Sequence, residues 1–307
     1  MRRFLPYTAV VTAMLIWGSS PIATKLTLGY LNPLTLITMR MSLAVMLMLV
    51  AGLLAGSLQR IEKKHLPLFL IGGFIQPFLY YVLETYGLRL SASPTVSEVL
   101  LSTSPLMAPL FAYILVHERV TWNNIVGILL STAGVVMMVF AGNASFSIGS
   151  PWGIVLLLAA VVMAVLYTVV LRKIPAKYNS FSTVFYIEAV SLLFFLPVWA
   201  VVDAPRLDQM KFEAEPLCAV AYLAVFASVV AFVLFCYAVR ELGVTRANAF
   251  NNTRPVFTAL IMLCFFGEHM PWMKWLAMAI VIIGLFICQY QKKNVSLSAK
   301  NPNPEKI

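Results

Sequence analysis

The chain has 307 residues, of which 61% are hydrophobic and 11% are charged, and its formal net charge is +10. Soluble domains average about 45–50% apolar and about 25% charged residues. The composition therefore argues against a water-soluble enzyme, a disordered chain and a disulfide scaffold. No stripe of Lys and Arg marks a nucleic-acid surface, so we expect the partner to be a lipid bilayer and no nucleic acid.

Ten windows are apolar enough, and at about 20 residues long enough, to cross a bilayer as helices. In chain order they are 7–26, 33–55, 66–88, 94–116, 122–140, 150–171, 181–202, 217–239, 246–267 and 271–290. The first window is long, contains Trp17 and has no clear cleavage site, so we interpret it as an uncleaved helix and not as a signal peptide. What remains is short loops and a polar tail, which predicts no soluble domain.

The basic residues indicate the orientation of these windows. With the N-terminus in the cytoplasm, the cytoplasmic loops hold roughly three times as many Lys and Arg residues as the opposite loops. Asp203, Asp208, Glu213 and Glu215 all fall in one opposite loop. We therefore expect a multi-pass protein of the inner (plasma) membrane, with an even number of spans and both termini cytoplasmic.

The second half of the chain repeats the first at an offset of 150 residues. The coinciding pairs are Thr103/Thr253, Pro105/Pro255, Leu110/Leu260, Glu118/Glu268, Trp122/Trp272 and Gly134/Gly284. Just upstream the offset becomes 151, which aligns Tyr86 with Tyr237 and Arg89 with Arg240. Because each copy holds five helices, an odd number, the copies enter the membrane in opposite senses, as in many secondary transporters.

This repeat predicts the fold class: an all-α polytopic membrane protein with ten transmembrane helices, built as two inverted five-helix repeats. The first repeat spans residues 1–143, the second spans 144–291, and a polar cytoplasmic tail covers 292–307. The helices of the second repeat then correspond one by one to those of the first, so that the second window matches the seventh and the fourth matches the ninth.

Several short motifs recur at characteristic places in this pattern. They are Trp17-Gly18-Ser19, Asn32-Pro33 followed by Arg40, Ser104-Pro105, Glu118-Arg119 before Gly127 and Gly134, and Gly267-Glu268 before Gly284. At this spacing, over residues 7–290, the chain resembles the EamA family of the drug/metabolite transporter superfamily. The resemblance implies ten helices, cytoplasmic termini, a central cavity lined by helices 1, 3, 4, 6, 8 and 9, and export or uptake of small metabolites such as amino acids, nucleosides or drugs.

Five charged residues fall inside the predicted spans, where each costs roughly 3 kcal/mol on insertion scales. Arg40, Glu84 and Glu98 lie in the outer half, and Glu188 and Arg254 lie in the cytoplasmic half. We hypothesise that each group forms an ion pair. Arg40, Glu98 and Glu188 are our candidates for gating or coupling, with Glu84 and Arg254 as substrate contacts. Static pairs that fix helix packing are the alternative, and proton coupling through Glu84 or Glu188 and facilitated diffusion both remain open.

Polar and aromatic side chains give further candidates for substrate contact. Prolines interrupt the fourth and ninth windows, which frees backbone carbonyls beside Ser102, Thr103, Asn251 and Asn252. Ordinary hydrogen bonding between helices is the alternative role for these four residues. The aromatic candidates for the cavity wall are Trp17, Tyr80 and Tyr167.

Other residues are predicted to be structural. Gly127, Ser131 and Gly134 share one helical face, as do Ala277 and Gly284, which predicts close packing of the fifth and tenth helices. Glu118 and Glu268 are predicted to cap the helices that follow them. The four cysteines have no metal-ligand spacing, and no nucleotide-binding or hydrolase motif occurs, so no metal, cofactor or enzyme activity is expected.

The sequence therefore predicts a secondary transporter of small amphipathic metabolites, with amino acids and related compounds as the leading class and export as the favoured direction. It would act as a monomer or homodimer, with protons as a candidate coupling ion. The alternatives are a nucleoside, sugar-phosphate or lipid-linked sugar carrier of the same superfamily, or a membrane receptor or scaffold without transport.

Overall fold

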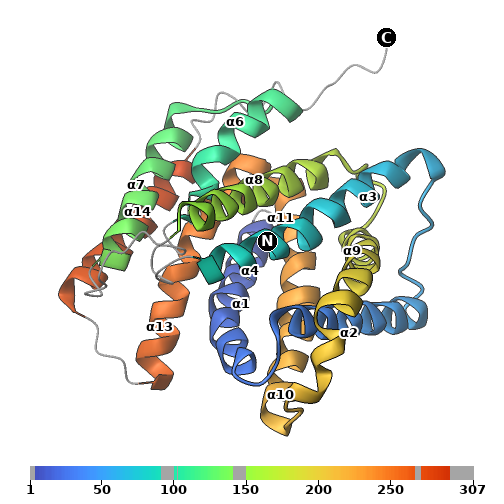
Figure 1. The fold of residues 1–307 in the computed structure, drawn as a ribbon. Coiled ribbons are helices and arrows are strands. Elements are labelled where there is room, and N and C mark those ends of the chain that lie inside the picture. The colour runs from blue at the N-terminus through green and yellow to red at the C-terminus, as the bar shows by residue number, and fades with distance from the viewer. Residues whose placement is uncertain (1–3, 91–99, 102, 141–149, 267–270, 291–307) are drawn as a thin grey trace.

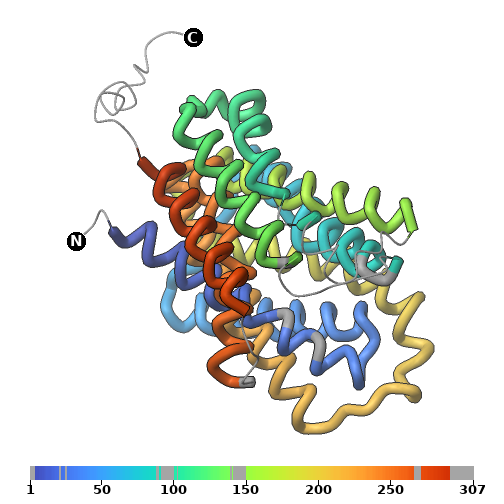
Figure 2. The backbone as a smooth tube through the Cα atoms, turned by 90° about the vertical axis from the view of Figure 1, so that its left-hand side faces the viewer, coloured from blue at the N-terminus to red at the C-terminus, as the bar shows by residue number. Residues whose placement is uncertain are grey.

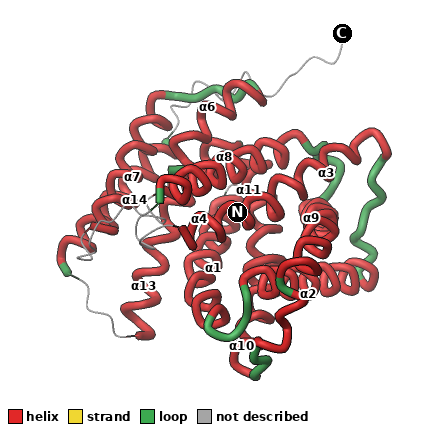
Figure 3. The backbone as a smooth tube through the Cα atoms, in the orientation of Figure 1, coloured by secondary structure: helices red, strands yellow, loops and turns green. Residues whose placement is uncertain are grey.

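The computed structural model describes residues 4–90, 100–101, 103–140, 150–266 and 271–290. Within these residues every regular element is helical (Figure 3). The elements before residue 143 are α1 (Leu5–Leu28), α2 (Pro33–Leu54), η1 (Lys63–His65), α3 (Leu66–Gly73), η2 (Phe74–Leu79), α4 (Tyr80–Leu90), α6 (Ser104–Val116) and α7 (Trp122–Phe140). Those after it are α8 (Pro151–Lys173), α9 (Ser180–Val202), η3 (Ala204–Gln209), α10 (Ala214–Tyr222), η4 (Leu223–Val230), α11 (Ala231–Leu242), α12 (Val244–Ala249), η5 (Phe250–Thr253), α13 (Arg254–Phe266) and α14 (Trp272–Gln289).

Many of these helices have the length and composition of membrane spans. Seven helical stretches of the described chain qualify: Leu5–Leu28, Pro33–Leu54, Lys63–Gly87, Pro151–Lys173, Ser180–Val202, Ala214–Leu242 and Trp272–Gln289. Two further apolar helices, Ser104–Val116 and Trp122–Met138, are shorter. Their exposed side chains include Leu54, Leu129, Leu193 and Phe286. Large apolar side chains around the whole bundle are solvated by lipid, so the chain is an all-helical membrane protein.

Two of the long stretches contain an interruption, and a third interruption lies between α12 and α13. Gln76 in η2 adopts extended backbone angles (φ −150°, ψ 128°), and Pro77 after it has no N–H to donate to the helix. The segment η4 has π-helical geometry throughout, and η5 is a 3-10 turn between α12 and α13. Interruptions at membrane depth are tolerated where they are buried in protein or line a polar site.

The helices α7 and α14 pack closely along each other on one side of the bundle (Figures 1 and 2). Their glycines allow this approach: a Cβ on Gly134 would lie only 2.8 Å from the Val281 nitrogen and 2.9 Å from the Ala277 oxygen. Likewise, a Cβ on Gly284 would lie 2.7 Å from the Gly127 oxygen. The structure therefore confirms the predicted close packing of these two helices, with backbone against backbone.

The remaining helices form the centre of the molecule. On one side α8 packs against α4 and α6, and on the other side α1 packs against α11 and α13. The helices α2 and α9 pack along each other and complete the bundle. The largest hydrophobic cluster lies between these groups and includes Met14, Phe69, Tyr167, Phe232 and Phe235.

The connections lie at two ends of the bundle, which differ in charge. We call the end that carries residues 55–65, 117–121, 172–179 and 240–246 the basic end. The end that carries residues 28–35 and 203–213 is called the acidic end. The α2–α3 and α8–α9 connections of the basic end lie side by side on the right of Figure 1. The Gln59 Nε2 donates a hydrogen bond to the Lys177 oxygen at 3.0 Å, and the Asn179 nitrogen donates to the Gln59 Oε1 at 2.6 Å.

Glu118 differs from its predicted role. Its carboxylate accepts hydrogen bonds from the backbone nitrogens of Val244 (2.8 Å) and Thr245 (3.1 Å), so it caps α12 and not the following helix α7. The reason is that α12 begins directly beside the α6–α7 connection, where Gly243 with φ 89° ends α11 and lies against this carboxylate. Glu268 lies outside the described residues.

Candidate functional site

The centre of the bundle holds a buried guanidinium. Arg40, on α2, is only 8% exposed. Its Nε donates to the Ser228 Oγ at 2.6 Å, and its Nη2 donates to the Tyr81 Oη at 2.9 Å. The guanidinium carbon also lies 5.2 Å from the centre of the Tyr81 ring. Arg40 therefore links α2 to η4 on one side and to α4 on the other, and these partners offset part of the cost of burying its charge.

A second buried charge, the Glu188 carboxylate, lies on α9, which packs along α2. Glu188 is 0% exposed, and neither of its oxygens has a hydrogen-bond partner among the described residues. Glu188 and Arg40 form no ion pair within 4.0 Å in the described chain. The Tyr167 hydroxyl and the Ser191 hydroxyl are also buried without a partner there. Buried polar groups are normally satisfied, so this group of atoms has unused capacity for a hydrogen-bonding solute.

Aromatic side chains surround the charges. The Trp17 Nε1 donates to the Ala227 oxygen at 3.0 Å, and its ring lies 5.0 Å from Phe232 and 5.1 Å from Phe235. Phe232 in turn lies 6.1 Å from the ring of Tyr167. The Arg254 guanidinium lies 5.8 Å from the centre of the Trp17 ring, a cation–π distance. An apolar or aromatic group can pack on this wall while its polar end meets the charges.

The structure groups the intramembrane charges differently from the sequence-based hypothesis. The expected ion pair of Glu188 with Arg254 is wrong, because neither Glu188 oxygen has a partner in the described chain and the Arg254 guanidinium lies over the Trp17 ring. Arg40 and Glu188 each lie about eight positions, or roughly 12 Å, from the start of α2 and of α9. Because these two helices begin at opposite ends of the bundle, Arg40 lies nearer the acidic end and Glu188 nearer the basic end. Glu84 accepts a hydrogen bond from the Tyr80 Oη at 2.8 Å. Glu98 lies outside the described residues.

The polar residues of the interrupted helices make contacts between and within helices. The Asn252 amide donates to the Ser131 Oγ at 2.8 Å and to the Thr132 Oγ1 at 3.1 Å, so it joins η5 to α7. Asn251 donates to Asn248 at 3.3 Å, and Thr103 donates to the Leu100 oxygen at 2.6 Å. These contacts are of the interhelical or local kind named above as the alternative. Ser102 lies outside the described residues.

Sequence reasoning misses Ser228 and Phe232 as members of this site. A single serine and a phenylalanine in a long apolar run carry no distinct signal. Only the repeat points to them, because the 151-residue offset of this part of the chain matches Ser228 with Pro77 of η2 and Phe232 with Tyr81.

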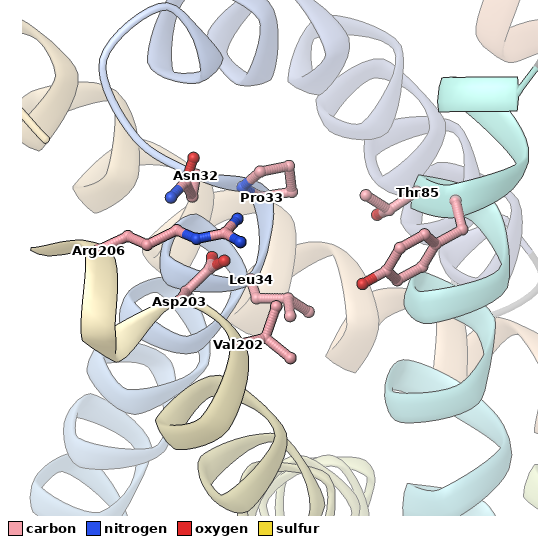
Figure 4. A pocket seen from close by; sticks show the side chains of 8 residues that line it. Asn32, Pro33, Leu34, Thr85, Val202, Asp203 and Arg206 are labelled. Atoms are coloured by element: carbon pink, nitrogen blue, oxygen red, sulfur yellow. The ribbon is translucent and has the colours of Figure 1, made fainter. Parts of the chain in front are cut away.

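A small cavity of about 40 Å³ lies at the acidic end (Figure 4). Its wall is formed by Asn32, Pro33, Leu34, Thr85, Tyr86, Val202, Asp203 and Arg206. In Figure 4, Thr85 on α4 faces Pro33 and Leu34 of α2 across this space. Below it, the Asp203 Oδ2 accepts hydrogen bonds from the Thr35 nitrogen at 2.9 Å and from the Thr35 Oγ1 at 3.3 Å, which caps the start of α2.

An all-helical membrane protein with buried charges and aromatic rings inside its spans has the features of a membrane transporter. The chain belongs to the EamA-like transporter family of the drug/metabolite transporter superfamily, whose family model matches residues 5–140 and 151–289.

Relatives that align with this chain over nearly their whole length are also named as transporters or exporters. The chain is 25% identical to the "Uncharacterized transporter YetK" of Bacillus subtilis, over 95% of this chain and 94% of the relative. It is 26% identical to a "Probable terminal-alkyne amino-acid exporter" of Streptantibioticus cattleyicolor, over 91% of each chain. The "Uncharacterized inner membrane transporter YedA" of Escherichia coli K12 is 24% identical over 93% of this chain and 91% of the relative. A protein of known crystal structure shares the fold, with a TM-score of 0.75 at 20% identity, over 92% of this chain and 96% of that one.

Proposed function

We propose that this transporter exports small amphipathic metabolites, with amino acids and related compounds as the leading class, across the inner membrane by alternating access. The observation that carries this proposal is that the bundle interior holds two buried charges, Arg40 on α2 and Glu188 on the adjacent α9, together with the rings of Trp17, Tyr81 and Tyr167. A solute with a carboxylate, an ammonium group and an apolar side chain can satisfy a guanidinium, a carboxylate and an aromatic wall at once. The printed name of the Streptantibioticus relative supports the same class.

Alternating access requires two halves that can exchange conformations, and we propose the ten-span inverted repeat for this role. The contacts between α7 and α14 support it. The 150-residue offset exchanges Gly134 with Gly284 and Gly127 with Ala277, so the contact of Gly134 with Ala277 becomes the contact of Gly284 with Gly127, and both occur. A twofold axis produces such reciprocal contacts. We further propose that the basic end is cytoplasmic, with both termini on that side.

Glu188 is our candidate for proton coupling. It is buried within the candidate span Ser180–Val202, and its oxygens have no hydrogen-bond partner in the described chain. A carboxylate that binds a proton facing one side and releases it to the other couples transport to a pH gradient. Flux that does not respond to an imposed pH gradient would exclude this role.

The decisive experiment is flux from proteoliposomes loaded in turn with aromatic, aliphatic and hydroxy amino acids and with nucleosides, with and without a pH gradient. We expect selective flux of one amino-acid class. The Arg40→Gln variant should lose that flux, at least about a hundredfold, because a buried charge-assisted contact is lost, while the protein still inserts and purifies. Arg60→Gln, at an exposed arginine of the basic end, is the matched control and should transport normally. Normal flux in Arg40→Gln, or no flux of any amino acid, contradicts the proposal.

A further inference from the structure

At the basic end, the side chain of Arg240, in the last turn of α11, contacts α9 and the turn before it. Its Nη1 donates to the Tyr178 oxygen and its Nη2 donates to the Thr183 Oγ1 at 2.8 Å. Both acceptors belong to the start of α9 and the turn before it. In addition, Arg172 of α8 donates to the Arg240 oxygen and so caps the end of α11. Three helices, α8, α9 and α11, are therefore joined at one point.

The acidic end contains the corresponding residues of the other repeat. Asn32 and Asn179 are both N-cap residues with extended angles (φ −68°, ψ 149° and φ −69°, ψ 159°), so the α1–α2 turn matches the α8–α9 turn. The 151-residue offset matches Thr85 and Tyr86 on α4 with Cys236 and Tyr237 on α11. The position of α4 relative to the α1–α2 turn is therefore equivalent to the position of α11 relative to the α8–α9 turn.

The two equivalent positions differ in how closely the helix approaches the turn. At the basic end α11 reaches the α8–α9 turn through Arg240, and Cys236 is 0% exposed. At the acidic end the cavity of Figure 4 lies between α4 and the α1–α2 turn, and Thr85, the match of Cys236, forms part of its wall. The structure is therefore closed at one end and partly open at the other, at equivalent positions of the two repeats.

We propose that the contact of Arg240 with Tyr178 and Thr183, which we call the Arg240 latch, holds the basic end closed, and that its release is coupled to closure of α4 onto the α1–α2 turn. The proposal rests on the proposed inverted repeat, because only two equivalent halves can exchange these conformations. A hydrogen bond from a charged group is worth enough to bias such an equilibrium about tenfold or more. Arg240 acts as a positioning residue and not as a substrate contact.

The matched residues supply a direct test. In one single-cysteine protein Cys236 is kept and Cys218, Cys264 and Cys288 become serine. In the other, all four native cysteines become serine and Thr85→Cys is added. The labelling rate by a water-soluble maleimide is measured for each in nanodiscs, without any substrate. With Arg240 present, we expect Thr85→Cys to react and Cys236 to be protected.

The Arg240→Gln substitution should reverse this pattern. We expect the labelling rate of Cys236 to rise about tenfold or more and that of Thr85→Cys to fall, because one charge-assisted contact is lost. Arg246→Gln, at the same end on α12, is the matched control and should change neither rate. Thr183→Val removes one acceptor with little change in shape and should shift both rates in the same directions but less, which keeps the test available if Arg240→Gln does not fold.

Each other outcome overturns the proposal. If Cys236 becomes reactive while Thr85→Cys is unchanged, Arg240 only packs locally and the ends are not coupled. If both rates rise, the substitution loosens the whole bundle. If neither changes, Arg240 does not hold the end closed. Because labelling needs no substrate, reciprocal labelling without amino-acid flux would retain the latch and reject the proposed substrate class, and selective flux without reciprocal labelling would do the reverse.

Discussion

The contacts that join the helices differ between the two ends of the bundle. At the basic end, side chains from four connections meet: Arg240 reaches the α8–α9 turn, Glu118 caps α12, and Gln59 and Glu62 join the α2–α3 connection to Asn179 and Lys177. At the acidic end, the contacts include one buried carboxylate on Thr35, a backbone hydrogen bond from Lys211 to Tyr30, and the cavity beside them. Under the proposed inverted repeat, this difference means that equivalent positions of the two repeats hold different conformations, and that side chains at the ends select which end is closed.

The largest loss of stability is expected in the packed pair α7 and α14, which supports both ends of the bundle. In Gly134→Leu, the new Cβ would lie 2.8 Å from the Val281 nitrogen, so the helices must separate along their length. We expect a loss of about 3 kcal/mol or more in unfolding free energy, visible as a large drop in the Tm of the purified protein. Leu129→Ala, on the lipid-facing side of the same helix, should change the Tm little. An unchanged Tm in Gly134→Leu would show that the close approach is absent.

A carboxylate caps a helix at each end of the bundle, Glu118 at the basic end and Asp203 at the acidic end. Substituting each of them gives a sharper comparison of the two ends. Glu118 at the basic end accepts with both oxygens, from Val244 and Thr245, so Glu118→Gln leaves one backbone N–H without its acceptor. We expect a loss of about 1–2 kcal/mol, measured as a drop in Tm. Glu241→Gln, on α11 close by and exposed, is the control.

Substitution of Asp203 at the acidic end should lower the unfolding free energy less than substitution of Glu118 does. Both of its hydrogen bonds from Thr35 go to the same oxygen, Oδ2, so the amide oxygen of Asp203→Asn can keep them. The expected loss is about 0.5 kcal/mol, the share due to charge at a helix start. The comparison fails if Asp203→Asn lowers the Tm as much as Glu118→Gln does.

Much of this architecture can be predicted from the sequence, because helices in lipid must be long and apolar and because the repeat places equivalent residues at a fixed offset. Apolar windows predict the helices, and the glycine spacing predicts the α7–α14 contact, because close backbone approach needs small residues at fixed positions. The partners of the charges are not predicted. Arg40 donates to Ser228 on η4 and to Tyr81 on α4, and these contacts depend on how the helices pack, which no local sequence pattern records. Glu118 is similar, since its partner α12 lies 126 residues further along the chain.

The smallest effect is expected at the Glu62 cluster, where the basic end is joined at its exposed surface. Hydrogen bonds from Lys177 and then Lys64 lower the pKa of Glu62 from its ordinary value of 4.5 to about 2. Because the folded pKa is depressed, the stabilisation is present above about pH 4.5 and is lost as the pH falls toward 2. The Tm difference between the unmodified protein and Glu62→Gln should therefore be small at neutral pH and disappear in acid.

Salt separates this exposed contact from the Arg240 latch. The Glu62 and Lys177 side chains are about half exposed, so in about 1 M NaCl, where the Debye length is about 3 Å, their attraction should be largely screened. The same salt should leave the protection of Cys236 from labelling unchanged, because the Arg240 acceptors Tyr178 and Thr183 are neutral and buried. If high salt exposed Cys236, closure of the basic end would depend on the surface ion pair and not on Arg240.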